Sequence, residues 1–331
     1  MSGEFFLGID GGGTKTLATI VDARGCVLGT GLAGASNVDD VGIEVATANI
    51  SQAVSQARTA AKLETLPFAA AFLGLAGVVS PRDRALVRGI AESLALARAE
   101  DILIDHDCQI ALAGGLSGRP GIVLIAGTGS SCYGRNANGQ TWRAGGWGSL
   151  ISDEGSGYWL GREGLIATVR ALDGRDATTA ITAPMLEHLE VSNPDDLLHR
   201  IYVTGLSRSE IAALAPVVIE AARASDSTAL NLIKHGSSLL AECVKAVVQK
   251  LNLEPECELV LVGGIFQAGE IILAPFRQSQ LEYNLKCKIT SPELSPSLGA
   301  CLLALEHRGL LTQSVMLELK SIESHISERN Q

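Results

Sequence analysis

Two short segments rich in glycine and hydroxyl side chains carry residue types that could bind phosphate. The first glycine loop, residues 10–16, reads Asp-Gly-Gly-Gly-Thr-Lys-Thr, and the second glycine loop, residues 126–131, reads Ala-Gly-Thr-Gly-Ser-Ser. Glycine lets backbone N–H groups approach phosphate oxygens, and hydroxyl groups add donors. One such loop fits an ordinary turn equally well, whereas two loops predict a cradle for a triphosphate. The residues expected to contact the phosphates are Gly11, Gly12, Gly13, Thr14, Lys15, Thr16, Gly127, Thr128, Gly129 and Ser130.

The first glycine loop begins with a carboxylate, Asp10, which would repel a phosphate at direct contact. A carboxylate can instead hold a hydrated Mg²⁺ ion, because oxygen atoms are the ligands that this ion prefers. Neither loop has the G-x-x-x-x-G-K-[ST] pattern of a P-loop. The predicted ligand is therefore a triphosphate with Mg²⁺, the ion being held by Asp10 through water and the phosphates by a pattern other than the P-loop.

A candidate general base follows a short apolar run at residues 102–104, where the chain reads Asp105-His106-Asp107. An alcohol that attacks a phosphoryl group needs a proton acceptor at about 2.6–3.2 Å, and a carboxylate at the end of a strand can supply it. The residue pattern alone favours the simpler interpretation that Asp107 caps the following helix. It also does not separate Asp105 from Asp107, because alternation along a strand puts both on one side.

Composition narrows the class of protein. The 331 residues carry a net charge of −10 without a basic stretch, which argues against a nucleic-acid partner. Hydrophobic residues make up 47% and charged residues 19%, as in globular proteins, and no apolar run approaches the ~20 residues of a membrane span. The N-terminus lacks a signal-peptide pattern, and the 7 cysteines are scattered without a C-x-x-C pair. We therefore expect a cytoplasmic protein with free thiols and no membrane association.

The elements that must position these residues follow one order in both halves. The pattern predicts strands at residues 5–9, 17–21 and 26–28, an amphipathic helix over 43–61, a strand at 69–75, a helix from Ser80 and a strand at 102–104. The second half starts in the same way, with strands at 121–125, 131–135 and 141–143, and has a later strand at 258–262. The prediction is a duplicated α/β fold of two domains, 1–118 and 119–331, that flank a nucleotide cleft, with a fraying helix at 313–331.

Together these motifs resemble a known family. The resemblance is carried by the two glycine loops, by Ser36-Asn37, by Asp107, by the segments 145–148 (Gly-Gly-Trp-Gly) and 152–157 (Ser-Asp-Glu-Gly-Ser-Gly), and by Gly263-Gly264. The chain resembles the N-acetylglucosamine kinase branch of the BadF/BadG/BcrA/BcrD ATPase family, within the actin-like sugar kinases. The resemblance implies a duplicated ribonuclease H-like fold, ATP and Mg²⁺ in the cleft, a sugar beneath the hinge, and Asp107 as the catalytic base.

The resemblance also implies which residues contact the ligands. Gly263 and Gly264 would bind the adenosine, and the sugar would contact Asn37, Asp107, Gly146, Trp147 and Asp153. Each sugar residue has a simpler interpretation: an Asx-turn for Asn37, a helix N-terminus for Asp153, and core packing for Trp147. His106 departs from the family, which often has Asn before this Asp.

The predicted activity is ATP-dependent phosphorylation of an amino sugar, from N-acetyl-D-glucosamine to its 6-phosphate. Glucosamine and N-acetylmuramic acid are the alternative substrates. An ATPase activator of a CoA-ester reductase or dehydratase is less favoured, because Cys132 has no cysteine partner at a spacing that would hold a cluster. A sugar-sensing transcription regulator is disfavoured, because the first strand begins too early for an N-terminal DNA-binding module. A homodimer would be ordinary for this resemblance.

Overall fold

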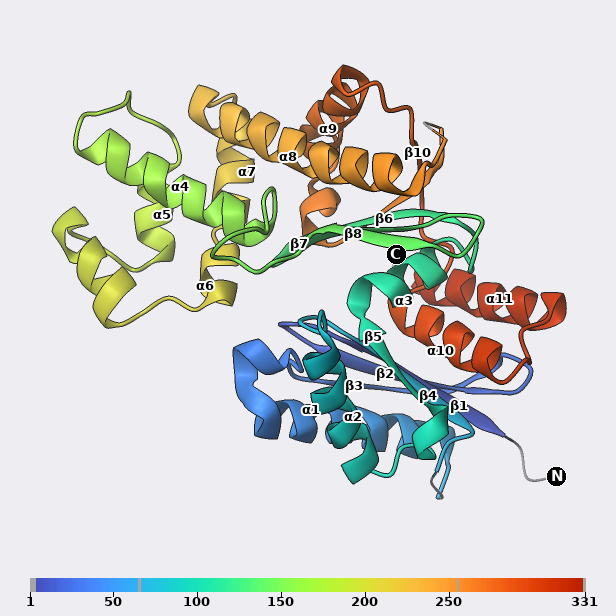
Figure 1. The fold of residues 1–331 in the computed structure, drawn as a ribbon. Coiled ribbons are helices and arrows are strands. Elements are labelled where there is room, and N and C mark those ends of the chain that lie inside the picture. The colour runs from blue at the N-terminus through green and yellow to red at the C-terminus, as the bar shows by residue number, and fades with distance from the viewer. Residues whose placement is uncertain (1–3, 65–66, 255, 330–331) are drawn as a thin grey trace. The chain divides into compact units, whose positions relative to one another are not determined.

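The computed structural model describes residues 4–64, 67–254 and 256–329, with side chains described up to residue 321. The chain forms two compact units (Figure 1). Unit 1 comprises Met1–Pro120 and Ser291–Gln331, and unit 2 comprises Gly121–Thr290. Each unit is built on one mixed sheet of 5 strands.

The sheet of unit 1 has the order β3-β2-β1-β4-β5. Its strands β1, β2 and β3 form an antiparallel meander, whereas β4 and β5 run parallel to β1. The strands are β1 (Phe5–Gly11), β2 (Thr16–Asp22), β3 (Val27–Ala33), β4 (Ala70–Leu75) and β5 (Ile102–His106).

The sheet of unit 2 repeats this topology strand for strand. Its order is β10-β9-β6-β7-β8, in which β6, β7 and β8 are the antiparallel meander and β9 and β10 run parallel to β6. The strands are β6 (Gly121–Ala126), β7 (Ser130–Arg135), β8 (Thr141–Gly145), β9 (Glu258–Val262) and β10 (Lys288–Thr290). The predicted duplication is confirmed by this matching order.

In unit 1 the sheet lies between two helical layers, as the alternation along β1 requires. Leu7 and Ile9 face the core beneath α1 and α2, whereas Phe6 faces the core beneath α3 and α10. Gly8 lies on the α10 side, where an added Cβ would come within 2.4 Å of the Ser297 carbonyl oxygen. The helices of unit 1 are α1 (Val38–Ala61), α2 (Pro81–Ser93), η1 (Ala99–Asp101), α3 (Asp107–Gly115), α10 (Pro296–His307) and α11 (Gln313–Arg329).

The predicted domain boundaries need one correction. The first boundary falls at Pro120, two residues from the predicted 118, but residues 291–331 belong to unit 1 and not to the C-terminal domain. The physical reason is that α10 buries Leu298 and Leu302 against Phe6 and Phe72 of the first sheet. The sequence shows that this last segment is apolar, but it does not show which of the two sheets the segment covers.

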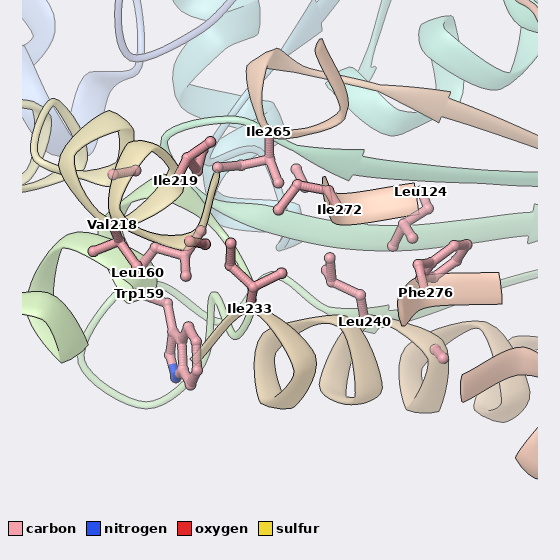
Figure 2. Packing of buried hydrophobic residues seen from close by; sticks show 14 of the residues in the cluster. Leu124, Trp159, Leu160, Val218, Ile219, Ile233, Leu240, Ile265, Ile272 and Phe276 are labelled. Carbon is pink, nitrogen blue, oxygen red and sulfur yellow. The ribbon is translucent and has the colours of Figure 1, made fainter. Parts of the chain in front are cut away.

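Unit 2 has a larger helical part, in which α8 packs on β7 and β8 and α9 packs beside α8 (Figure 1). Its core joins Leu124 of β6 to Leu240 of α8 and Phe276 of α9, and includes Trp159 (Figure 2). Trp159 is thus a core residue. The helices are α4 (Gly157–Leu172), α5 (Thr182–His188), η2 (Pro194–Asp196), η3 (His199–Val203), α6 (Arg208–Ala212), α7 (Ala215–Arg223), α8 (Ser227–Leu251), η4 (Gly264–Ala268) and α9 (Glu270–Glu282).

All 7 cysteines are free thiols, as predicted. Among the described residues, no helix has the length and apolar character needed to cross a bilayer.

Candidate active site

The first glycine loop connects β1 to β2 through a tight turn. The backbone N–H of Gly12 donates to the Lys15 carbonyl oxygen over 2.9 Å, and the Gly12 carbonyl accepts from Ser36 over 3.0 Å. Within the part of the chain that the structure describes, the backbone N–H groups of Gly13 and Thr14 donate no hydrogen bond. The turn therefore holds its own shape and leaves two adjacent donors for a ligand.

The glycines of this loop meet different needs. A Cβ at Gly11 would lie 2.2 Å from Ser36 Oγ and 2.3 Å from Leu75 Cδ2, so the packing of unit 1 excludes a side chain there. A Cβ at Gly12 would meet only the Lys15 carbonyl oxygen, at 3.9 Å. Gly11 therefore permits close packing, whereas Gly12 keeps the outer face of the loop open.

The two carboxylates predicted to take part in the reaction both belong to unit 1. Asp10 is the second-last residue of β1, and Asp107 is the first residue of α3, directly after β5. Burial, and then the charge of Asp107, raise the pKa of Asp10 from 3.8 to about 6, while Lys15 opposes the shift. The Asp107 side chain forms no capping hydrogen bond, ion pair or other hydrogen bond with any described residue.

The rival carboxylate, Asp105, has a different setting. Its Oδ1 accepts from Arg84 Nη2 of α2 over 2.7 Å and from the backbone N–H of His106 over 2.9 Å. Asp105 is thus held in an ion pair with Arg84 of α2. Asp107 instead lies close enough to Asp10 for its negative charge to raise the pKa of Asp10. A base must be able to accept a substrate proton, and Asp107 is the carboxylate that keeps this capacity.

The neighbouring carboxylates Asp10 and Asp107 suit a hydrated Mg²⁺ ion. Their repulsion raises the pKa of Asp10, and a cation beside them would offset that repulsion. His106, Asp107 and Cys108 also offer possible ligand atoms within 4.8 Å of one another. A thiol and an imidazole are poor ligands for Mg²⁺, so this second group does not fit the expected ion.

Asn37 lies beside the first glycine loop but has local partners. It is buried and caps α1: its Oδ1 accepts from the backbone N–H of Asp39, and its Nδ2 donates to Asp40 Oδ2 over 2.7 Å. The structure therefore supports the simpler interpretation of an Asx-type cap. A contact between Asn37 and a sugar stays a prediction.

The second glycine loop, between β6 and β7, has the same organisation as the first. The backbone N–H of Gly127 donates to the Gly129 carbonyl oxygen over 2.9 Å, which closes the turn. The backbone N–H groups of Thr128 and Gly129 donate no hydrogen bond to any residue that the structure describes. An added Cβ at Gly127 would meet no atom within 4 Å, so this loop also has an open face.

The N-terminus of α4 supports the second glycine loop from within unit 2. Backbone N–H groups of Gly157 and Tyr158 donate to the carbonyl oxygens of Gly127 and Thr128, over 2.8 and 3.1 Å. Ser156 caps the helix by accepting from the Trp159 N–H over 3.2 Å. The first turn of α4 thus uses its free donors to fix the loop.

Asp153 lies on the inner side of the same loop. Its side chain is 3% exposed and forms an ion pair with Arg208 Nη2 over 2.6 Å. Asp153 Oδ1 also accepts from the backbone N–H of Ser130 over 3.3 Å. Burial raises the pKa of Asp153, and the Arg208 charge and the Ser130 N–H counteract that rise. Both carboxylate oxygens therefore hold partners of unit 2, and a contact of Asp153 with the sugar stays a prediction.

Gly263 and Gly264 lie close to the second glycine loop. Gly263 has a φ of +114°, and a Cβ there would come within 2.3 Å of the Ala126 carbonyl oxygen and 2.9 Å of the Gly127 nitrogen. At Gly264 a Cβ would meet nothing within 4 Å. The predicted adenosine residues and the predicted phosphate loop of unit 2 therefore adjoin, with bare backbone at Gly264.

Trp147 is not a core residue. It is 66% exposed, and the Arg143 guanidinium lies over its ring at 5.0 Å from the centroid. The same arginine donates from Nη1 to the Gly146 carbonyl oxygen over 2.9 Å, and Gly146 has a φ of +69° that favours glycine. Arg143 thus fixes an exposed aromatic face, which can pack against an apolar surface of a ligand.

Comparison with known proteins decides the family. The model of the BadF/BadG/BcrA/BcrD ATPase family matches residues 7–304. The chain belongs to this family. It is 32% identical to an N-acetylmuramic acid/N-acetylglucosamine kinase of Clostridium acetobutylicum, over 91% of this chain and 98% of the relative. It is also 32% identical to an N-acetyl-D-glucosamine kinase of Dictyostelium discoideum, over 93% and 100%. A crystal structure from Chromobacterium violaceum, provisionally described as an N-acetylglucosamine kinase, is 28% identical with a TM-score of 0.74, over 91% and 99%.

In this member of the BadF/BadG/BcrA/BcrD ATPase family, the sequence-predicted residues form two groups, one in each unit. Unit 1 holds the first glycine loop, Asn37 and the Asp10–Asp107 pair, and unit 2 holds the second glycine loop, Gly263–Gly264, Trp147 and Asp153. Sequence reasoning missed Arg208. The pattern Ser207-x-x-Glu210 signals a helix start there, and the structure has that capping box. No sequence signal connects Arg208 to Asp153, 55 positions away.

Proposed function

We propose that this ATPase-family member is a cytoplasmic amino-sugar kinase that transfers the γ-phosphoryl group of ATP to the 6-hydroxyl of N-acetylglucosamine. The observation that carries the proposal is the pair of matching glycine loops, each with two adjacent backbone N–H groups that have no partner among the described residues. The carboxylate of Asp107 likewise has no hydrogen-bond or ionic partner there. Donors for phosphate and an acceptor for a hydroxyl proton are the groups that phosphoryl transfer to an alcohol requires.

The nucleotide would be held by backbone. The N–H groups of Gly13 and Thr14 in one unit, and of Thr128 and Gly129 in the other, would donate to phosphate oxygens of a single ATP. The Thr14 and Thr128 hydroxyls and the Lys15 ammonium would add donors. The open backbone at Gly264, adjoining the second glycine loop, would lie along the adenosine.

Asp107 would act as the general base. The sugar hydroxyl donates its proton to Asp107 as its oxygen attacks the γ-phosphorus, the bond from that phosphorus to the β-phosphate oxygen breaks, and ADP leaves. Asp10 would hold Mg²⁺ through its water shell, and the bound ion would supply positive charge that stabilises the phosphates. Loop N–H groups would stabilise the negative charge that develops on the transferred group.

The sugar would be recognised near Asp107 by groups that the structure leaves accessible. The exposed ring of Trp147, fixed by Arg143, offers a surface for the apolar face of the sugar or its N-acetyl methyl group. Gly146 would present backbone beside it. Asn37 and Asp153 would contribute only by exchanging partners that they already hold.

Relatives support an amino-sugar substrate but differ in which one. The relatives described above include a protein named for both N-acetylmuramic acid and N-acetylglucosamine and a protein named for N-acetylglucosamine alone. N-acetylglucosamine is the substrate that both names share. Glucosamine and N-acetylmuramic acid remain the alternatives.

A sugar panel tests the proposal. ADP formation would be measured with N-acetylglucosamine, glucosamine, N-acetylmuramic acid or no sugar, and the phosphorylated carbon would be identified by NMR. We expect N-acetylglucosamine to give the highest kcat/KM and a 6-phosphate product. Equal ADP formation with and without every sugar would contradict the proposed kinase.

The burial of Cys132 bears on the reductase-activator alternative, which needs an accessible cysteine to bridge a cluster shared between subunits. Cys132, the cysteine nearest the second glycine loop in sequence, is buried with 0% exposure on β7. A cysteine in the core of unit 2 cannot reach a partner subunit, so the structure gives this alternative no support.

A further inference from the structure

Arg208 is in van der Waals contact with the second glycine loop. An ideal Cβ built on Gly129 would lie 2.2 Å from Arg208 Nη2, so the guanidinium occupies the space that a side chain at Gly129 would need. The same nitrogen donates to Asp153 Oδ2 over 2.6 Å. The Asp153 oxygens would lie only 2.9 and 3.0 Å from that Cβ. Gly129 therefore rests directly on an Arg208–Asp153 ion pair.

This ion pair also fixes one backbone donor of the loop. Asp153 Oδ1 accepts from the Ser130 N–H over 3.3 Å, and the Ser130 hydroxyl donates to the Glu154 carbonyl oxygen over 2.8 Å. The Asp153 side chain is 3% exposed, and its φ of +64° is uncommon for a residue other than glycine. A buried carboxylate needs a compensating charge, and Arg208 supplies it.

The position of Arg208 is set by close packing of α6 on α4. A Cβ at Gly161 of α4 would come within 1.9 Å of the Ile211 carbonyl oxygen, and one at Gly157 within 3.4 Å of the Ala212 carbonyl oxygen. Gly161 therefore allows the two helices to approach, whereas the distance at Gly157 is an ordinary contact. The capping box formed by Ser207 and Glu210 fixes the start of α6 at Arg208. Arg208 is therefore presented from a defined place.

We propose that Arg208 is a positioning residue for nucleotide binding: by pairing with Asp153 it holds the second glycine loop in the shape that presents the Thr128 and Gly129 N–H groups. Arg208 acts through Asp153 and the loop, not by touching the sugar. The inference rests on the proposed function, because it assigns the ligand of that loop as the phosphates of ATP.

The consequence of removing the guanidinium follows from burial. Asp153 would be left in the interior without its ionic partner, and it would either take up a proton or move toward water. Protonation would weaken the hydrogen bond from the Ser130 N–H, because a neutral carboxyl group is a poorer acceptor, and movement would break it. Either response loosens the loop. Nucleotide binding should therefore weaken, while Asp107, in the other unit, keeps its setting.

The test compares three substitutions in the full-length protein by the affinity for MgADP, measured by calorimetry, and by KM for ATP and kcat. Arg208→Gln should weaken MgADP binding and raise KM for ATP by about 10-fold, with a smaller change in kcat, because the donors are misplaced rather than removed. Arg208→Lys should recover part of the loss. Arg170→Gln is the matched control, because Arg170 forms an exposed ion pair with Asp176 near the C-terminal end of α4, away from α6 and the second glycine loop.

A double-mutant cycle with Asp153→Asn decides whether Arg208 acts through Asp153. In that background no buried carboxylate needs compensation, so Arg208→Gln should change MgADP affinity by less than about 2-fold. An undiminished effect there, or an equal loss in Arg170→Gln, would overturn the inference. If Arg208→Gln does not fold, the Lys variant and the double variant still give the comparison. A wild-type protein that binds MgADP but phosphorylates no sugar would contradict the proposed function and leave this inference about the nucleotide loop intact.

Discussion

The carboxylates of Asp10, Asp105 and Asp107 occupy three electrostatic settings within unit 1. Asp10 is buried and its pKa is raised to about 6, Asp105 is paired with Arg84, and Asp107 has no partner among the described residues. The sequence places Asp105 and Asp107 at one strand end but does not separate them, since the separation depends on an arginine that α2 brings from 21 positions away. Their roles follow from neighbours, not from residue type.

Replacing the base gives the first prediction. Asp107→Asn keeps the shape of the side chain but removes the proton acceptor, so kcat should fall by about 10²- to 10⁴-fold while the sugar still binds. Steady-state kinetics with N-acetylglucosamine, together with sugar binding by calorimetry, would measure both. The control is Asp105→Asn, which loses a partly exposed ion pair worth about 1 kcal/mol or less and should keep its turnover. The reverse ranking of the two variants would show that Asp105 is the base.

At the scale of elements, the two glycine loops were the most readable part of the site. Glycine runs directly after apolar strands predicted both turns, and the structure confirms both strand ends. The tertiary contacts of the two loops could not be predicted from the sequence. The Ser36 hydroxyl that excludes a side chain at Gly11, and the ion pair beneath Gly129, come from residues distant in sequence. The residue types of a turn can be recognised from the local sequence, whereas the side chains that pack against its glycines depend on the tertiary structure.

The open face of the second glycine loop gives a prediction that separates binding from stability. In Gly127→Ala the added methyl group meets no atom within 4 Å, so the melting temperature should be nearly unchanged. The methyl group would stand on the face that receives the phosphates, so MgADP affinity should fall by about 10-fold or more. Thermal unfolding and calorimetry would test the two parts.

The control for this substitution is Gly89→Ala in α2, where an added Cβ likewise meets nothing within 4 Å. It should bind MgADP as the wild type does, and the higher helix propensity of alanine should make it slightly more stable. If Gly127→Ala also bound MgADP normally, the open face of the second glycine loop would not be the nucleotide-binding face.

At the scale of the molecule, each unit repeats one five-stranded topology, and the chain returns to unit 1 after completing unit 2. Strand patterns predicted the duplication but not this return. Glu293 helps to fix the returning segment: it accepts from Ser117 and Arg119 after α3, over 2.5 and 2.6 Å, and pairs with Lys320 of α11 over 2.5 Å. One carboxylate thus joins three segments of unit 1.

This arrangement predicts an acid-sensitive contribution to stability. Hydrogen bonds from Arg119, Lys320 and Ser117 lower the pKa of Glu293 from 4.5 to about 2. A lowered pKa in the folded state means that the stabilisation is fully present above about pH 4.5 and is lost as the pH falls toward 2. Glu293→Gln should therefore lower the free energy of unfolding by about 1 kcal/mol at pH 7, after allowance for solvent screening.

Thermal unfolding between pH 7 and pH 2.5 would measure this effect, and the difference between the variant and the wild type should shrink with acidification. Glu270→Gln is the control, since the Glu270 side chain is 71% exposed in its pair with Arg277 and should contribute little at any pH. A Glu293 effect that stayed constant down to pH 2.5 would show that its charge is not responsible.

The most direct test of the account is amide hydrogen exchange with and without MgADP, followed in peptides that cover residues 11–16 and 127–130. The N–H groups of Gly13, Thr14, Thr128 and Gly129 have no partner among the described residues and should exchange rapidly in the free protein. If both loops bind one nucleotide, MgADP should slow exchange in both peptides at the same nucleotide concentration. Protection of one loop alone, at saturating MgADP, would contradict the account.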